Sequence, residues 1–447
     1  MTRRSPFPWR RPRFELALLA LVAISALSVV QRVEAEDTTR MCLTAALSHG
    51  NLSNDACFPA AGRAVAHGHS YANVAPGVSA LAVPAANVVG LPSPERWATN
   101  DDLQLWLVRV TSVGLGLLVC AFLLGRVAEG LAPGWGGAVL VTFALGTIAS
   151  AVAPSIFDHV PAAALAFAAF VLAWSGRFGL AGLAAGLALP VEYQALVAAA
   201  ILAAYAAASG RHALVRFGAG CVPGAVLIAA YDWAAFGSPF STSYGASPTQ
   251  PDAGVAGVAL PTLHGAHLVL AGERGLLAVS PVLVASAAGL VVLRRRAPLE
   301  AIVCAAVTVA FLLLDCGYAL PYGGDSPGPR FVVTALPFLA VGLAPAFARA
   351  PVPTSVLAAA SLLASTGIAL TWPNGVNSAS GYAGTVWTQL AKLVDDGARA
   401  PIATWIEPTV FGRLGVGTLG GGAIVLAAGA AALALALAEG RRATTLS

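Results

Sequence analysis

The sequence predicts an all-helical integral membrane protein with about twelve transmembrane helices (ten to twelve) and long outer loops. Hydrophobic residues make up 57% of its 447 residues and charged residues only 10%, against roughly 25% charged in soluble proteins. Apolar stretches approaching the length of about 20 residues that a bilayer span needs recur along the chain. We therefore expect residues 1–447 to form a single polytopic membrane domain.

The charged residues exclude several classes of soluble protein. Lys392 is the one lysine among 25 basic residues, and because no glycine-rich run precedes it, the chain has no phosphate-binding P-loop. A scattered net charge of +4 argues against nucleic-acid binding. Gly324-Asp325-Ser326-Pro327-Gly328 matches the serine nucleophile elbow in form only, because it joins two membrane segments instead of a strand and a helix.

Twelve apolar segments are the candidate spans. The first follows a basic N-terminus, as in a signal peptide, but no small-residue cleavage site stands out after it, so we expect it to remain as a span. The fifth and sixth meet at Pro190 and could instead form one kinked or re-entrant unit. The segments are residues 14–30, 103–124, 135–153, 160–175, 178–190, 192–208, 217–235, 276–293, 299–317, 331–348, 353–371 and 419–438.

The placement of arginine orients these segments. Basic residues accumulate in short cytoplasmic loops, and 15 of the 25 lie before the first segment or in loops that fall on the same side. We therefore predict a multi-pass protein of the plasma membrane with both termini in the cytoplasm and an extracytoplasmic active face. The loops predicted to face outward are residues 31–102, 236–275, 318–330 and 372–418. We expect the first of them to contain a juxtamembrane helix.

Two of the outer loops carry further signals. Cys42 and Cys57 share the 31–102 loop, and an oxidising outer compartment favours a disulfide between them. In the 372–418 loop, Val386, Trp387 and Leu390 recur at helical spacing. This spacing predicts either a helix on the membrane surface or one that packs on other loops.

Ionisable residues gather where spans end on the outer side. Such groups are costly near hydrocarbon and are functional candidates by default. A single acid of this kind could also do no more than pair with an arginine or stabilise the start of a helix through its dipole. After the outer ends of the first, third and fifth candidate spans, this set includes Glu36, Asp37, Asp158, His159 and Glu192.

Arg274 and Arg330 complement these acids, because each directly precedes a span. A guanidinium can bind phosphate with two parallel hydrogen bonds, whether the phosphate belongs to a substrate or to a membrane lipid. Carboxylates, a histidine and arginines together suit sugar transfer, in which a carboxylate deprotonates an acceptor hydroxyl and arginines stabilise the departing phosphate. Nucleotide sugars are not available outside the cell, so the expected donor is a sugar on a polyprenyl phosphate. The expected acceptor is a cell-envelope glycan or glycolipid.

Seven short segments, in matching order, also carry a family resemblance. They are Glu36-Asp37-Thr38-Thr39-Arg40, Gly68-His69-Ser70-Tyr71-Ala72-Asn73, Phe157-Asp158-His159, Glu192-Tyr193, Phe236-Gly237-Ser238-Pro239, Arg274-Gly275-Leu276 and Gly328-Pro329-Arg330-Phe331. On these segments the sequence resembles the GT-C glycosyltransferases, and specifically actinobacterial members related to the mannosyl- and arabinosyltransferases of cell-wall assembly.

The resemblance implies an inverting hexosyl or pentosyl transfer centred on an acidic residue of the first outer loop. We expect Asp37 to be the general base, with Glu36 and Asp158 assisting in positioning or metal binding. A divalent cation, if the reaction uses one, would lie between Asp37 and Asp158. The residues expected to contact the donor are Arg274, Arg330, His159, Glu192, Tyr71 and Asn73.

Two departures from the family pattern keep other functions open. Many relatives carry a lysine where Val74 stands and an aspartate where Gly62 precedes Arg63. Loss of these charges would fit altered donor choice, or a non-catalytic relative that binds lipid-linked sugars. A secondary transporter is the other alternative, since twelve spans with cytoplasmic ends also suit a carrier, although the two halves show no clear repeat.

Overall fold

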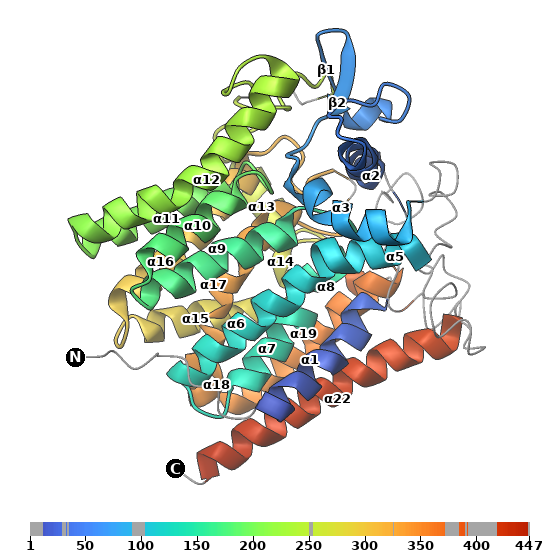
Figure 1. Cartoon of the computed structure of the whole chain (residues 1–447). Helices are drawn as coiled ribbons and strands as arrows, with labels where there is room; N and C mark the ends of the chain where they lie inside the picture. Colours follow the sequence, from blue (N-terminus) through green and yellow to red (C-terminus); the bar gives the residue numbers. More distant parts are fainter. Residues whose placement is uncertain are drawn as a thin grey trace.

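A bundle of helices makes up most of the molecule, with a short helix and a two-stranded hairpin at one end (Figure 1). The computed structural model describes residues 12–28, 33, 35–91, 103–249, 254–324, 326–371, 384–388, 391 and 418–445. The 372–418 loop, with its predicted surface helix, falls mostly outside these residues.

The N-terminal third supplies the hairpin end and the first helices of the bundle. A π-helical segment, η2 (Val110–Gly114), joins α5 to α6 without interrupting the helix. The elements are α1 (Pro12–Leu27), α2 (Ala35–Ser48), η1 (Ala60–Gly62), β1 (Arg63–Ala66), β2 (His69–Ala72), α3 (Gly77–Val89), α5 (Leu103–Arg109), α6 (Leu115–Leu131), α7 (Gly136–Gly146) and α8 (Ala149–Val152).

The remaining helices complete the bundle. They are α9 (His159–Trp174), α10 (Phe178–Ala188), α11 (Ala195–Ala208), α12 (Arg211–Phe236), α13 (Leu263–Ala271), α14 (Leu276–Val279), α15 (Leu283–Leu293), α16 (Pro298–Gly317), the 3-10 helix η3 (Arg330–Ala335), α17 (Leu336–Ala340), α18 (Leu343–Arg349), α19 (Pro351–Thr371) and α22 (Thr418–Thr445). Of the two segments that meet at Pro190, each forms its own helix, α10 and α11.

Several of these helices are long and apolar enough to cross a membrane. Among the described residues, five qualify singly: the continuous helix over residues 103–131, then α12, α16, α19 and α22. Two broken pairs also qualify, residues 263–293 with a 94° bend and residues 330–349 with a 51° bend. The chain is therefore mostly helical with several candidate membrane helices, while the count of about twelve spans stays a prediction.

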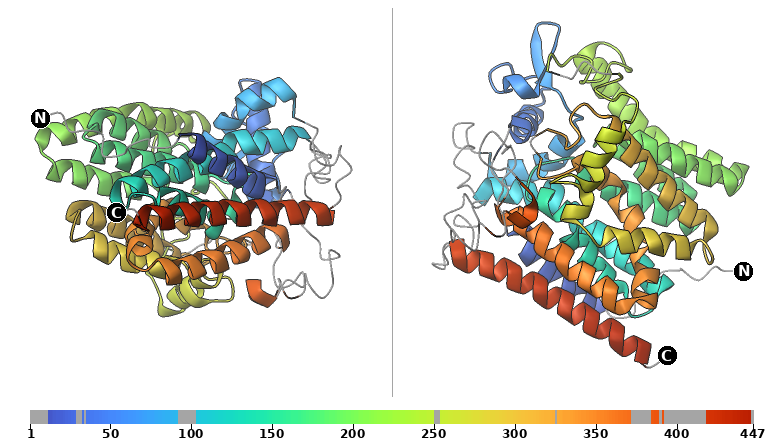
Figure 2. Two further views of the ribbon diagram at one scale, coloured as in Figure 1. Left: turned by 90° about the horizontal axis from the view of Figure 1, so that it is seen from below. Right: turned by 180° about the vertical axis from the view of Figure 1, so that it is seen from behind.

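Small residues set how closely the helices pack. A Cβ atom added to Gly182 of α10 would lie 1.9 Å from the carbonyl oxygen of Phe217 in α12, and one added to Gly224 would lie 2.0 Å from that of Gly186. Such close approach of two backbones is typical of helix pairs in membranes. At the opposite edge, α22 lies along α1 and α19 (Figure 2), where the Ser25 hydroxyl donates to the Val425 carbonyl at 3.0 Å.

Candidate active site

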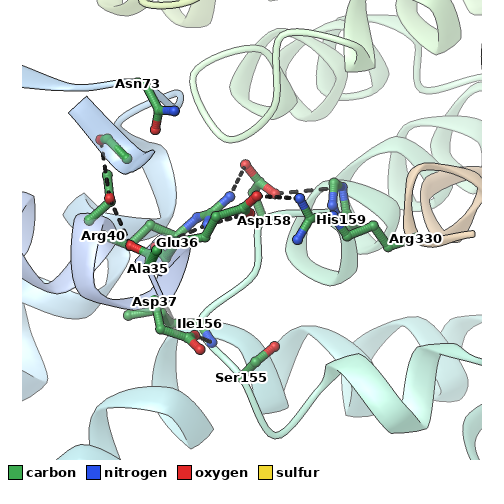
Figure 3. A network of polar contacts seen from close by, with 12 residues as sticks. Ala35, Glu36, Asp37, Arg40, Asn73, Ser155, Ile156, Asp158, His159 and Arg330 are labelled. Carbon is green, nitrogen blue, oxygen red and sulfur yellow. Dashed lines mark hydrogen bonds and ion pairs between the residues drawn. The ribbon is translucent and has the colours of Figure 1, made fainter. Parts of the chain in front are cut away.

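The first turn of α2 begins the site. Glu36 and Asp37 lie in this turn, and Arg40 follows one turn later on the same face as Glu36. Arg40 Nη1 donates to the Glu36 backbone carbonyl at 3.2 Å and to Glu36 Oε2 at 3.4 Å. The other terminal nitrogen of Arg40 donates to Asp158 Oδ2 at 2.9 Å (Figure 3).

Arg330 reaches the same carboxylate from the far side. Its Nη2 donates to Glu36 Oε1. Its guanidinium lies 4.7 Å from the centre of the Phe157 ring, and the Arg40 guanidinium lies 5.5 Å from that ring. Glu36 is therefore held between two arginines that share one aromatic platform.

A second group of polar side chains continues from Asp158. His159 Nδ1 lies 3.5 Å from Asp158 Oδ1 and 2.8 Å from Glu192 Oε1. The Thr334 hydroxyl donates to Glu192 Oε2 at 2.6 Å. The structure thus brings Glu36, Asp158, His159, Glu192 and Arg330 into one connected network, although up to 294 residues separate them in the chain.

The charges of this network support one another. Burial alone would raise the pKa of Glu36, but Arg330 and Arg40 outweigh it and hold the pKa below its ordinary value. Burial would also raise the pKa of Asp158, but Arg40 and His159 outweigh it and hold that pKa below its ordinary value. Burial would lower the pKa of Arg40, but Asp158 and Glu36 raise it above its ordinary value. Both carboxylates and Arg40 are therefore ionised at neutral pH.

Exposure distinguishes Glu36 from its neighbours. The Glu36 side chain is 34% exposed, whereas Arg40 and Asp158 are 2% and 4% exposed. His159 and Glu192 are 3% and 2% exposed. Glu36 is therefore the carboxylate at which this buried network meets its surroundings.

Asp37 points away from this network, although it is the next residue. It has no exposed surface, and its Oδ1 accepts a 2.8 Å hydrogen bond from the backbone N–H of Ile156. Its Oδ2 lies 3.8 Å from Arg109 Nη2 of α5. Asp37 thus holds α2 against the α8–α9 connection.

Within the described parts of the chain, no group of three or more His, Cys, Asp or Glu side chains could hold a metal ion. Asp37 and Asp158 also face different partners, Arg109 and Arg40.

The loop before η3 contacts both arginines that were predicted to bind phosphate. Arg274 Nη1 donates to the Ser326 carbonyl at 2.9 Å, and its guanidinium lies 4.5 Å from the centre of the Tyr322 ring. Gly323 has a φ of +72° and lies against Arg330, where an added Cβ would be 2.6 Å from Nε. Only glycine adopts this backbone conformation readily, so this loop can cover Arg330 closely.

Tyr71 and Asn73 belong to the hairpin region. The Tyr71 ring packs edge-on to Phe236 at 5.6 Å, in a small apolar cluster with Ala64, Tyr231 and Ala235. The Asn73 amide donates to the Ala61 carbonyl at 3.3 Å. These contacts support the hairpin, and a role of either residue in donor binding stays a prediction.

Cys42 of α2 is joined to Cys57 by a disulfide with a Cα–Cα distance of 5.7 Å.

The two departures from the family pattern fit their surroundings. A Cβ atom at Gly62 would lie 1.7 Å from the hydroxyl oxygen of Thr39, which donates to the Gly62 carbonyl at 3.1 Å. Val74 is 6% exposed and packs in the main apolar core. Neither place has room for a charged side chain in this structure.

Three site residues were missed by sequence reasoning. Arg40 had a usable signal, because it lies four residues after Glu36, the spacing at which two side chains share one face of a helix. Thr334 and Tyr244 had none, since both lie far from the acids in sequence. The Tyr244 ring packs edge-on to Tyr193 at 5.4 Å, and burial, followed by the negative charges of Asp158 and Glu192, raises the pKa of Tyr244.

An apolar groove runs beside the site along α15 and α16. It encloses about 620 Å³. Its walls are almost entirely aliphatic and extend from Leu270, Leu276 and Leu277, which flank Arg274 in sequence, to Ile302 and Arg294 near the other end of these helices.

Solved structures share this fold over nearly the whole chain. ArnT from Cupriavidus metallidurans in its apo state matches with a TM-score of 0.55 at 14% identity, over 96% of this chain and 76% of ArnT. The structure of the same ArnT bound to undecaprenyl phosphate matches with a TM-score of 0.54, at the same identity and coverage. The apo oligosaccharyltransferase of Archaeoglobus fulgidus gives 0.46 at 13% identity, over 97% of this chain and 56% of that one.

The two ArnT matches show the fold. The chain shares the helical fold of ArnT at a TM-score above one half. Membership of the GT-C glycosyltransferases, which the sequence resemblance implies, stays a prediction. No family model matches the sequence, and no curated protein does.

Proposed function

We propose that this protein is a glycosyltransferase that moves a sugar from a polyprenyl-phosphate donor to a hydroxyl group of a glycan or glycolipid. One observation carries the proposal: a partly exposed carboxylate, Glu36, lies between two guanidinium groups in an otherwise buried charged network. This arrangement offers a proton acceptor and phosphate-binding cations side by side. The fold shared with ArnT supports the same assignment.

The reaction would use an exchange of ion-pair partners. The phosphate of the incoming donor takes Arg330 from Glu36, since a guanidinium binds phosphate with parallel hydrogen bonds. Glu36 then accepts the proton of the acceptor hydroxyl while the oxygen of that hydroxyl attacks the anomeric carbon of the donor sugar. The configuration at this carbon is inverted. The bond from that carbon to the phosphate oxygen breaks, and Arg330 and Arg274 stabilise the leaving polyprenyl phosphate.

We assign the base to Glu36 instead of Asp37. Asp37 has no exposed surface, accepts a hydrogen bond from a backbone N–H and faces Arg109, so it cannot meet an acceptor hydroxyl unless α2 moves. Glu36 is partly exposed and needs no such movement. Asp158 and Glu192 keep Arg40 and His159 in place, so we propose that they position the reacting groups.

The apolar groove is our proposed site for the polyprenyl chain of the donor. Its wall residues Leu270 and Leu276 lie within four residues of Arg274, so a lipid tail in the groove would bring its phosphate toward the two arginines. The solved structure of ArnT bound to undecaprenyl phosphate supports a donor of this class. Placement of about twelve spans, of cytoplasmic termini and of an extracytoplasmic hairpin end remains part of this proposal.

Transfer by the purified protein in lipid tests the proposal. A panel of labelled polyprenyl-phosphate sugars, both hexosyl and pentosyl, is incubated with membrane glycan acceptors. We expect transfer from at least one donor, lost in Glu36→Gln and kept in Asp55→Asn, a matched change at an exposed hairpin-end carboxylate. Donors that bind without transfer in the native protein would favour the non-catalytic relative, and the absence of any binding would favour the carrier.

A further inference from the structure

A polar pocket separate from the candidate active site is lined by residues of α1, α6, α7 and α22. The start of α1 and the end of α22 lie at the end of the bundle opposite the hairpin (Figure 1). The pocket encloses about 470 Å³, within the range of roughly 300–1,000 Å³ that is typical of small-molecule sites. Its walls come from the start of α1, the α6–α7 connection, the α15–α16 loop and the end of α22. Nothing in the proposed transfer reaction uses it.

Side chains of both charges line this pocket. Glu15, Glu129 and Glu439 supply carboxylates, and Arg126 and Arg296 supply guanidinium groups. The Glu129 carboxylate is fixed by the backbone N–H groups of residues 134 and 136, which donate to it at 3.0 and 3.2 Å. A ligand that carries both a cation and an anion would match this lining.

Two buried polar atoms at the pocket have no partner among the described residues. Trp135 is 1% exposed and stacks on Phe347 at 5.3 Å, yet its indole N–H has no acceptor. Glu15 Oε2 is also buried without a donor. Buried polar groups are rarely left unpaired. Both residues line the pocket, so a ligand that draws either side chain toward it would supply the missing partner.

The position of the pocket selects the kind of ligand. The long helices of residues 103–131 and 420–443, both candidate membrane spans, end at it. In a membrane that these helices cross, the pocket would lie at the depth where lipid headgroups meet the hydrocarbon. Phe14, Phe122 and Leu140 add an apolar wall beside the charges. A lipid headgroup with its acyl chains in the bilayer fits such a boundary.

We propose that this pocket binds the headgroup of a zwitterionic aminophospholipid, phosphoethanolamine on a diacylglycerol. The ammonium group would donate to Glu15 and the other carboxylates, and the phosphate would accept from the Trp135 indole and the two arginines. A choline headgroup has no N–H to donate, and a glycerol headgroup has no cation for three carboxylates. The pocket therefore discriminates among lipids of the same chain length.

Native mass spectrometry of the purified full chain tests this directly. The protein is equilibrated with an equimolar mixture of phosphatidylethanolamine, phosphatidylcholine and phosphatidylglycerol of matched acyl chains, and the retained lipid is counted. We expect the native protein to retain phosphatidylethanolamine preferentially. Arg296→Gln and Glu15→Gln should each reduce this preference by about tenfold.

Arg295→Gln is the matched control, because it removes the same charge from the neighbouring exposed residue, which does not line the pocket. It should keep the native preference. Equal retention of the three lipids by the native protein would overturn the proposal, and so would equal losses in Arg295→Gln and Arg296→Gln. Arg296 is itself exposed, so its variant should fold, which melting curves would verify. No transfer activity is measured, so failure here is separate from failure of the proposed function.

Discussion

Glu36 and Asp37 show how two adjacent carboxylates acquire different surroundings. Successive residues of an α-helix point about 100° apart, so Glu36 faces Arg330 and Arg40 while Asp37 faces Ile156 and the α5 helix. The sequence predicted that acids of the first loop take part. It could not show which of the two reaches the site, because the rotation of α2 is set by contacts with residues more than 100 positions away.

The Arg40–Asp158 pair should contribute strongly to stability. Both side chains are almost fully buried and 2.9 Å apart, so Asp158→Asn would remove the charge closest to Arg40 and leave Glu36, at 3.4 Å, as its ion-pair partner. Removing one partner of a buried pair costs about 3–5 kcal/mol. We expect a clear fall in melting temperature in detergent, measured by tryptophan fluorescence. A melting temperature equal to that of the native protein would contradict the role of this pair.

The depressed pKa values of Glu36 and Asp158 predict an acid-dependent loss of stability. Carboxylates whose pKa is lower in the folded state stabilise the fold fully above their unfolded values, near 4. This contribution is lost as the pH falls through the lower folded-state values. The melting temperature should therefore change little from pH 7 to about pH 5 through these groups, then fall. In Glu36→Gln the fall should be smaller, and an identical acid profile would argue against the predicted pairing.

At the scale of elements, α2 is positioned by its packing on the hairpin and on α3. Thr39 donates to the Gly62 carbonyl, and the Ser79 hydroxyl of α3 donates to the Arg40 carbonyl at 2.9 Å. The disulfide from Cys42 to Cys57 adds a covalent tie between α2 and the loop before the hairpin. These contacts keep the first turn of α2, and with it Glu36, at the network.

Restoring the aspartate of the family pattern at Gly62 should disturb this contact. The new Cβ would overlap the Thr39 hydroxyl, and overpacking of this kind costs about 1–3 kcal/mol. We expect Gly62→Asp to lower the melting temperature, and the double change with Thr39→Ala to recover part of the loss. A stable Gly62→Asp single variant would show that the departure is not steric.

The helices show what hydrophobic pattern can and cannot predict. Each of the twelve predicted segments contains helix, because apolar runs of this length favour helices in a membrane. The sharp bends were not predicted. One of them brings Gly342 so close to α15 that an added Cβ would be 2.0 Å from the Ser286 carbonyl, and such an approach depends on the partner helix and not on the segment itself.

For the whole molecule, the pairing of distant residues is the part that sequence left open. Arg330 and Glu36 were each predicted as site residues, and only the fold shows that they meet across 294 positions. The structure does not bring the Asp37 and Asp158 carboxylates together, because they face Arg109 and Arg40 respectively. Arg274 contacts the loop that precedes Arg330, so both predicted phosphate ligands border one loop.

The groove along α15 and α16 gives a prediction at this scale. Ala305 lines it, so Ala305→Trp should obstruct a polyprenyl tail and raise KM for a long-chain donor by about tenfold or more. A short-chain donor should be affected far less. Leu313→Trp is the control, because this half-exposed residue of the same helix is not part of the groove wall. Equal KM changes for both chain lengths would contradict the groove as the tail site.

Glu36 and Asp37 are distinguished as the reacting carboxylate by paired measurement of transfer rate and melting temperature on Glu36→Gln and Asp37→Asn. We predict that Glu36→Gln lowers kcat by at least about 100-fold, as expected for loss of a general base, with a smaller change in melting temperature than Asp37→Asn. Asp37→Asn should mainly lower the melting temperature and keep measurable transfer below it. A stable, inactive Asp37→Asn protein beside an active Glu36→Gln protein would contradict the account.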